Sequence, residues 1–261
     1  MAPSSSRTRG GSSAADRNVM TSGSGNYGVF ISGAGSNNNR ISGNYLGTDA
    51  TGNTAVGSSW NAVALFNSGT GNVIGGSSAG QGNVINAVGG VPVYLSGAGS
   101  GSVVQGNRIG VAASGSATLS GATNGITLTA SSNGVSILDN WIANTNNDGI
   151  NVAANITGTM IQGNRIGTDL AGTANWGTNL SGIRLAGNNT GTQVGGSSGA
   201  QGNTIAFSNF SNGANDAITV VSGTGNAILG NAIYGTVGAG LGIDLGTSGV
   251  TANDVSDADT G

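Results

Sequence analysis

One short phrase recurs eight times along the chain: a small residue, an apolar residue, any residue and a second apolar residue. The copies begin at Gly28, Ala62, Pro92, Gly125, Gly149, Gly182, Ala217 and Gly242, so successive copies start 24 to 35 residues apart. A repeat of this period is typical of a solenoid, and alternation within it indicates a strand and not a helix. Because one copy is too small to bury its own apolar face, the copies must stack to form a core.

The repeats therefore predict an all-β protein, a single-stranded parallel β-helix of about eight rungs or more. Strands of successive rungs would pair in parallel, about 4.8 Å apart. The apolar positions then line the interior as two aliphatic columns, from Val29 and Ile31 in the first copy to Ile243 and Leu245 in the last. The position between them points outward and forms its own column: Phe30, Ala64, Tyr94, Thr127, Asn151, Arg184, Thr219 and Asp244.

A second phrase places Gly-Asn between apolar residues at 41–46, 104–109, 161–166 and 228–233, and at 137–142 with Asp139 in place of glycine. Glycine tolerates the left-handed conformation of a tight corner, and the asparagine can turn inward to bond the backbone of a neighbouring rung. We therefore expect a ladder of stacked asparagine side chains at this corner. The residue after each asparagine belongs to a second outward column: Tyr45, Arg108, Trp141, Arg165 and Ala232.

Two longer phrases lengthen some of the rungs. One spans 75–83 and 195–203, with a degenerate copy at 10–18, and the other is Gly-Thr-Asp-x-x-Gly at 47–52 and 167–172, with a worn copy at 110–115. Such inserts project from the corners of a solenoid, where loops are tolerated. We expect Asp49 and Asp169 to cap the turns of the second insert and not to act in catalysis.

Composition narrows the classes of partner. The chain has no Lys, Glu, His or Cys, and its net charge is −3. Without a basic cluster we expect no nucleic-acid binding, and without cysteine no disulfide or thiolate metal site. No apolar run approaches the roughly 20 residues that span a bilayer, so no membrane insertion is expected. Residues 1–9 lack both the repeat and the apolar segment of a secretory signal, and we interpret them as a disordered start or an expression remnant. Residues 10–261 form one predicted β-helix domain.

Several of these motifs resemble a known family. The runs Ile41–Asp49, Asn72–Ser78 and Leu241–Leu245 are similar to the right-handed parallel β-helix repeats of large bacterial secreted and cell-surface proteins. The tail at 249–261 resembles that family's closing segment, which there continues further, so we expect this chain to be a fragment of a longer protein. The resemblance implies a right-handed coil of the pectate-lyase-like superfamily and an extracellular or cell-surface location. Lyases, hydrolases and epimerases share that superfamily, so the fold alone does not choose an activity.

The leading hypothesis is a non-catalytic, adhesin-like surface module that binds polysaccharide. Aromatic faces stack on sugar rings, and Arg and Asn reach hydroxyls or carboxylates in a fixed geometry. The candidate ligand-binding residues are Tyr94, Asn151, Arg184 and Asp244 in the first outward column, and Tyr45, Arg108, Trp141 and Arg165 in the second. A second interpretation is that these large residues only strengthen packing between rungs.

A polysaccharide lyase or glycoside hydrolase is the alternative function. The missing residue types leave only Asp, Ser, Thr and Tyr as bases or nucleophiles. A glycosidase needs two carboxylates about 5 to 9.5 Å apart, and Asp216 and Asp244 fall on adjacent rungs but in different columns. A lyase of this superfamily would use calcium, acidic ligands and a basic residue, and the resemblance suggests Arg184 near Asp244. No catalytic residue is predicted.

Three further hypotheses concern the surface. Asp254, Asp257 and Asp259 offer hard oxygen ligands at close spacing that suit Ca²⁺, with a frayed acidic tail as the other interpretation. Ice binding would need a threonine ladder, but the first outward column has only Thr127 and Thr219, which are not adjacent. A β-helix also has exposed strand edges at its ends, which predicts end-to-end self-association.

Overall fold

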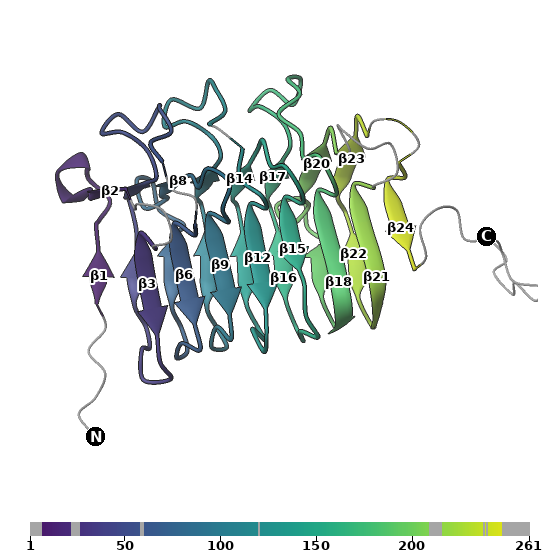
Figure 1. The fold of residues 1–261 in the computed structure, drawn as a ribbon. Helices are drawn as coiled ribbons and strands as arrows, with labels where there is room; N and C mark the ends of the chain where they lie inside the picture. The colour runs from purple at the N-terminus through teal and green to yellow at the C-terminus, as the bar shows by residue number, and fades with distance from the viewer. Residues whose placement is uncertain are drawn as a thin grey trace, which may run out of the picture.

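The chain winds into a coil with three flat faces. The computed structural model describes residues 7–21, 27–57, 60–119, 121–208, 216–236, 238 and 240–246. In these residues every turn of the coil gives one strand to each of three parallel sheets, which we name A, B and C (Figure 1). Each sheet has eight strands, and the one helical element among the described residues is a 3₁₀ turn at Ala14–Asp16.

The three sheets run the length of the coil. Sheet A contains β1 (Thr8–Arg9), β4 (Arg40–Ile41), β7 (Val73–Gly75), β10 (Val103–Gln105), β13 (Ser136–Leu138), β16 (Met160–Gln162), β19 (Gln193–Gly195) and β22 (Ala227–Leu229). Sheet B contains β2 (Val19–Met20), β5 (Tyr45–Leu46), β8 (Val84–Ile85), β11 (Arg108–Ile109), β14 (Trp141–Ile142), β17 (Arg165–Ile166), β20 (Thr204–Ala206) and β23 (Ala232–Tyr234). Sheet C contains β3 (Val29–Ser32), β6 (Val63–Phe66), β9 (Val93–Ser96), β12 (Ile126–Thr129), β15 (Ile150–Val152), β18 (Ile183–Thr190), β21 (Ile218–Thr224) and β24 (Ile243–Leu245).

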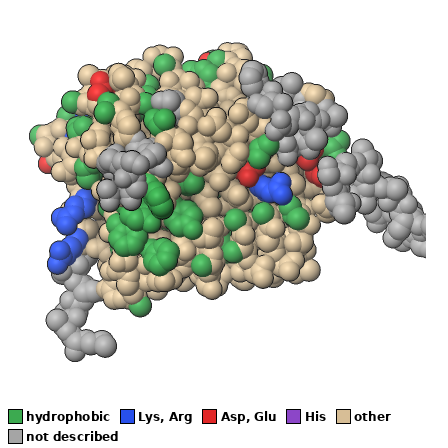
Figure 2. Space-filling model, viewed as in Figure 1, with side chains coloured by type: hydrophobic (Ala, Val, Ile, Leu, Met, Phe, Trp, Pro, Cys, Tyr) green, Lys and Arg blue, Asp and Glu red, His purple; other side chains and the backbone are tan. Residues whose placement is uncertain are grey.

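The coil is right-handed. In Figure 1 the strands of sheet C run downward at the front while the chain advances from left to right, and the chain returns upward behind them. Figure 2 shows the same side of the molecule with its side chains, so the outer face of sheet C points toward the viewer. The fold prediction, a right-handed parallel β-helix of about eight rungs, is confirmed.

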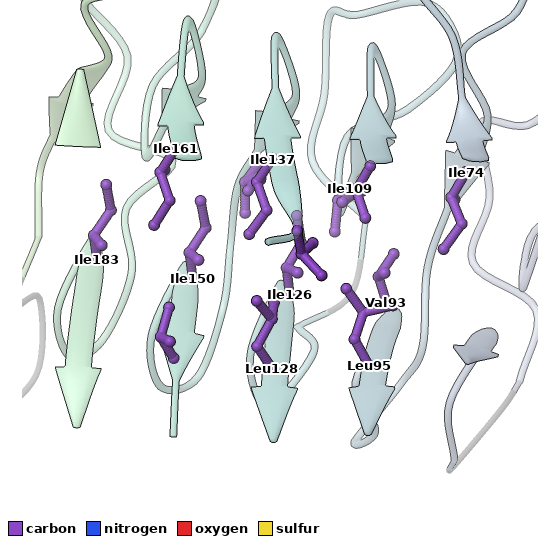
Figure 3. Packing of buried hydrophobic residues seen from close by; sticks show 14 of the residues in the cluster. Ile74, Val93, Leu95, Ile109, Ile126, Leu128, Ile137, Ile150, Ile161 and Ile183 are labelled. Carbon is purple, nitrogen blue, oxygen red and sulfur yellow. The ribbon is translucent and has the colours of Figure 1, made fainter. Parts of the chain in front are cut away.

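The register of sheet C places the repeated phrases as predicted. Val29 pairs with Val63 and Ile31 with Leu65, and the same alignment continues strand by strand to β24. Because side chains alternate along a strand, this register sends every repeated aliphatic residue to the same side. Figure 3 shows the labelled side chains of sheet C reaching across the interior toward those of sheets A and B. The core is one continuous aliphatic stack along the coil axis.

The predicted asparagine ladder lies at the corner between sheets A and B. The side-chain carbonyl of Asn107 accepts hydrogen bonds from the backbone N–H of Asn83 at 3.1 Å and from its amide group at 2.9 Å. The Asn107 amide group donates in turn to the Ile74 carbonyl at 3.0 Å. The same pattern joins Asn18, Asn44, Asn83, Asn107, Asn140, Asn164, Asn203 and Asn231. The ladder therefore satisfies polar groups that the corner would otherwise bury without partners.

The backbone of this corner requires a left-handed residue. Gly106 has φ +68, and a side chain there would meet the Gly76 carbonyl oxygen at 2.4 Å. Asp139 occupies the same corner position one turn later with φ +53. Aspartate is among the few residues that tolerate this conformation, which explains the one departure from glycine in the repeat.

Three inserts project between sheet B and sheet C, after β5, β11 and β17. Each is closed by an antiparallel bridge, as between Thr168 and Asn175. Asp169 accepts hydrogen bonds from the backbone N–H groups of Thr173 at 2.7 Å and Ala174 at 2.9 Å. Those N–H groups hold the pKa of the Asp169 carboxyl below its ordinary value. Asp49 accepts equivalent bonds from Asn53 and Thr54, so the prediction that both aspartates cap turns is confirmed.

The described part of the chain contains no helix that is long and apolar enough to cross a membrane.

Candidate ligand-binding face on sheet C

The first outward column forms a straight line of side chains across sheet C. Backbone pairing joins Phe30 to Ala64, Ala64 to Tyr94 and Tyr94 to Thr127, and continues from Thr127 to Asn151. It then runs through Arg184 and Thr219 to Asp244. Four of the predicted ligand-binding residues, Tyr94, Asn151, Arg184 and Asp244, therefore share one face of one sheet.

Aromatic side chains gather on the N-terminal part of this face. The rings of Tyr27 and Phe30 stack with centroids 4.6 Å apart, Trp60 meets Tyr27 edge-on at 6.4 Å, and Phe66 lies 6.2 Å from Phe30. Phe30, Trp60 and Phe66 are 46%, 47% and 41% exposed, which is high for side chains of this size. Figure 2 shows the hydrophobic side chains grouped on the left half of the face. We call Tyr27, Phe30, Trp60 and Phe66 the aromatic patch. Tyr94 lies further along the outward column, on the strand after that of Ala64.

Sequence reasoning missed most of the aromatic patch. Phe30 was placed in the outward column, but Tyr27, Trp60 and Phe66 were not considered as ligand-binding residues. Tyr27 lies three residues before the outward position Phe30, Trp60 lies four before the outward position Ala64, and Phe66 lies two after Ala64. The signal was present, since residues two positions apart on a strand share a face.

The central part of the face is polar. Asn151 pairs with Arg184 on the next strand, and the Asn151 side-chain carbonyl is buried without a hydrogen-bond partner among the described residues. The Arg184 guanidinium also has no hydrogen bond within the described part of the chain. Four other arginines differ, since each donates to a backbone carbonyl: Arg17, Arg40, Arg108 and Arg165. Arg184 therefore keeps unused hydrogen-bonding capacity on this face, whereas the unsatisfied Asn151 carbonyl oxygen is buried.

Two aspartates beside this column are buried. Asp148 is 3% exposed and accepts a hydrogen bond from the backbone N–H of Ser181 at 3.1 Å. Burial raises its pKa to about 6, against the opposing effects of that hydrogen bond and of the Arg184 charge. Asp216 accepts from the N–H of Leu241 at 2.6 Å. Its pKa is also raised, first by burial and then by its interaction with Asp244.

The contact between Asp216 and Asp244 differs from the sequence expectation. Different columns on adjacent rungs predict that these carboxyls lie apart, but they lie close enough for Asp244 to raise the pKa of Asp216. Asp216 lies at the corner that leads into β21, and Asp244 points outward from the middle of β24. A side chain at a corner can point toward the next strand. Strand alternation, from which the columns are predicted, does not give the orientation of a corner residue.

The second outward column lies on sheet B, with Val84 and Thr204 interposed among the predicted residues. Its large side chains hold the inserts. Trp141 stacks on Trp176 with ring centroids 5.6 Å apart, and its indole N–H donates to the Thr168 carbonyl at 2.7 Å. Arg165 donates to the Asp169 carbonyl at 3.2 Å.

The N-terminal members of this column make similar contacts. Arg108 donates to the Ala113 carbonyl, and its guanidinium lies 5.9 Å from the Trp141 ring. The Arg17 guanidinium lies 4.0 Å over the ring of Tyr45. Tyr45, Arg108, Trp141 and Arg165 therefore have structural partners, whereas Arg184 makes no side-chain hydrogen bond to any described residue.

The predicted calcium ligands Asp254, Asp257 and Asp259 lie outside the described residues. Within the described residues, no group of three or more acidic, histidine or cysteine side chains is arranged to hold a metal ion.

Comparison of the chain with models of protein families, with curated proteins and with solved structures finds no match in any of the three.

Proposed function

We propose that this protein is a non-catalytic surface module that binds polysaccharide along the outer face of sheet C. The observation that carries the proposal is the exposed aromatic patch, formed by side chains from successive turns of the coil. Aromatic rings bind the apolar faces of sugars, and the flat sheet holds them without a large entropy cost on binding. The column beyond Tyr94 adds Asn151 and Arg184, which can donate to hydroxyl or carboxylate oxygens.

The spacing of the face suits an extended polymer. Strands of a sheet lie about 4.8 Å apart, which is comparable to the length of one sugar unit in a polysaccharide. A chain lying parallel to the coil axis would thus pass the aromatic patch and then Tyr94, Asn151 and Arg184, which are the partly exposed members of the column. The aromatic patch would hold the first sugars, and Asn151 and Arg184 later ones.

An enzyme that cleaves polysaccharide is the second candidate, because Asp148, Asp216 and Asp244 lie near Arg184 on this face. Two features favour the non-catalytic function. Asp148 and Asp216 are almost fully buried, and each uses a carboxylate oxygen to accept a backbone N–H from the next turn. Asn61 and Asn124 accept a backbone N–H from the next turn in the same way at the equivalent corner of other turns.

The remaining parts of the proposal rest on the sequence. We place the protein with the bacterial secreted or cell-surface β-helix repeat proteins of the pectate-lyase-like superfamily, on the motifs named above. Ice binding has less support, since Thr127 and Thr219 are three strands apart and only 6% and 8% exposed.

The test combines binding with product analysis. The purified chain is screened against a glycan array and soluble polysaccharides, with and without Ca²⁺, and compared with Trp60→Ala and Phe66→Ala. Each substitution is expected to weaken binding about ten-fold, because the contact of one aromatic ring with a sugar face is worth on the order of 1 kcal/mol or more. Leu170→Ala is the control, since Leu170 is 72% exposed on an insert away from sheet C. Unchanged binding by both aromatic variants, or release of shortened products, would overturn the proposal.

A further inference from the structure

A cavity lies at the corner between sheets A and B, away from the outer face of sheet C. It has a volume of about 340 Å³ and lies against the insert at 75–83, which leads from β7 to β8. Its lining combines Arg17, Tyr45 and Arg108 with the Gly-Ser stretch of the insert. No acidic side chain is among its lining residues. Its walls therefore carry two positive charges and no negative one.

The two arginines are held in place without being neutralised. Arg17 donates from Nε to the Gly43 carbonyl at 3.2 Å and stacks over the Tyr45 ring, and Arg108 donates to the Ala113 carbonyl. These acceptors are backbone carbonyls and not carboxylates, so the charges remain available to a ligand. The nearest acid in sequence, Asp16, accepts instead from the Ser13 hydroxyl at 2.7 Å.

The insert adds backbone donors. The N–H groups of Ser77, Ala79 and Gly80 have no acceptor among the described residues, and Ser77 and Gly80 are exposed. The turn itself is closed by Gln81, whose side-chain carbonyl accepts the Ser78 N–H at 3.2 Å. Exposed backbone N–H groups in a glycine-rich turn, next to arginine, are a common way to bind a tetrahedral oxyanion.

The chain contains its own comparison site. The insert at 195–203 has nearly the same sequence and the same turn, in which Gln201 accepts the Ser198 N–H at 3.2 Å. Its surroundings differ: the corner position of Arg17 is taken by Asp139, and the strand position of Arg108 by Ala232. The insert is thus a repeated structural element, while the paired arginines belong only to its first full copy.

We propose that the cavity beside the 75–83 insert binds a sulfate or phosphate group carried by a polysaccharide. Arginine recognises such groups by two parallel hydrogen bonds, and the insert supplies further N–H donors opposite it. This inference does not depend on the aromatic patch, because the two sites lie on different faces of the coil.

The first experiment follows backbone amide signals by NMR while sodium sulfate, then dextran sulfate or unmodified dextran, is added to the full chain. Signals of 77–80 are expected to shift with sulfate and with dextran sulfate, while those of 197–200 stay in place. Dextran sulfate is expected to bind more than ten-fold more tightly than sulfate alone, whereas dextran leaves the insert unchanged. A response to sulfate but no gain with dextran sulfate would restrict the site to the free ion and overturn the polysaccharide part.

The second experiment changes the arginines. Arg17→Gln combined with Arg108→Gln is expected to weaken dextran sulfate binding at least ten-fold. Arg165→Gln is the matched control, since it also loses an arginine anchored to an insert carbonyl but lies outside the cavity. Ala232→Arg tests the reverse and leaves the first site intact: it should make the amides of 197–200 respond to sulfate. Equal shifts at both inserts in the unaltered protein, or equal losses in the Arg17/Arg108 and Arg165 variants, would overturn the site.

Discussion

Asp148 fills a corner position that asparagine fills in other turns of the coil. Asn61 and Asn124 accept a backbone N–H from the next turn there, as Asp148 does from Ser181. An asparagine does this without charge, whereas an aspartate must either ionise in a buried site or bind a proton. The free energy of unfolding should therefore depend on pH through this one side chain.

The direction of this pH dependence follows from the raised pKa of Asp148. Burial raises the pKa of Asp148 from 3.8 to about 6, so its stabilising contribution is complete below about pH 4 and is lost as the pH rises toward 6. The full loss would be ~3 kcal/mol. Asp148→Asn is expected to raise the free energy of unfolding at pH 7 by up to that amount and to flatten the profile between pH 4 and 7. Urea unfolding across this range measures it, with exposed Asp139→Asn as the control. A variant as pH-dependent as the unaltered protein would contradict the assignment.

For the outward side chains, the repeat predicts position along the sheet but not the contacts with residues outside the repeat. Tyr94, Asn151 and Arg184 could be aligned from sequence because a strand repeats every two residues and the copies are in register. The roles of Trp141 and Arg165 could not be predicted, since their partners are insert residues whose path the repeat does not specify. The contact between Asp216 and Asp244 was missed for the same reason, because it joins a corner to a strand.

The inserts are elements that depend on the sheet beneath them. Trp141 in β14 holds the insert at 168–176 by stacking on Trp176 and by its bond to the Thr168 carbonyl. The insert has few buried apolar side chains of its own; Leu170 at its tip is 72% exposed. Trp141 therefore anchors the insert to the neighbouring turn, in addition to the bonds that Asp169 makes within the insert.

Removal of that side chain should loosen the insert. Trp141→Ala is expected to lower the free energy of unfolding by ~3 kcal/mol, and Trp141→Phe, which keeps a ring but loses the hydrogen bond, by ~1 kcal/mol. Limited proteolysis should then cut first between 168 and 176. Leu170→Ala, on the same insert, should change stability by less than about 0.5 kcal/mol. An insert that stays resistant in Trp141→Ala would show that it orders itself.

Charge is distributed unevenly over the whole molecule. Residues 1–130 carry five Arg and two Asp, a net charge of +3, and residues 131–261 carry two Arg and eight Asp, a net charge of −6, which together give −3. The last described strand of sheet C, β24, leaves Ile243 and Leu245 41% and 60% exposed. Opposite charges on the two halves favour head-to-tail contact between copies.

We therefore expect concentration-dependent association of this chain that weakens as salt is added, measured by light scattering. Ile243→Lys places a charge on the edge of β24 and should keep the chain monomeric at the same concentration. Scattering that indicates a single monomer at every concentration and low salt would rule out the association.

The asparagine ladder has a consequence for the order in which the protein folds. Among the described residues each ladder asparagine bonds only within its own turn and to the turns next to it, and the sheets pair only neighbouring turns. A turn can therefore complete its bonds as soon as its successor has been synthesised, without waiting for the rest of the chain. Growth would proceed from the N-terminal side, so the arginine-lined cavity and the aromatic patch would be finished while the acidic half is still being translated.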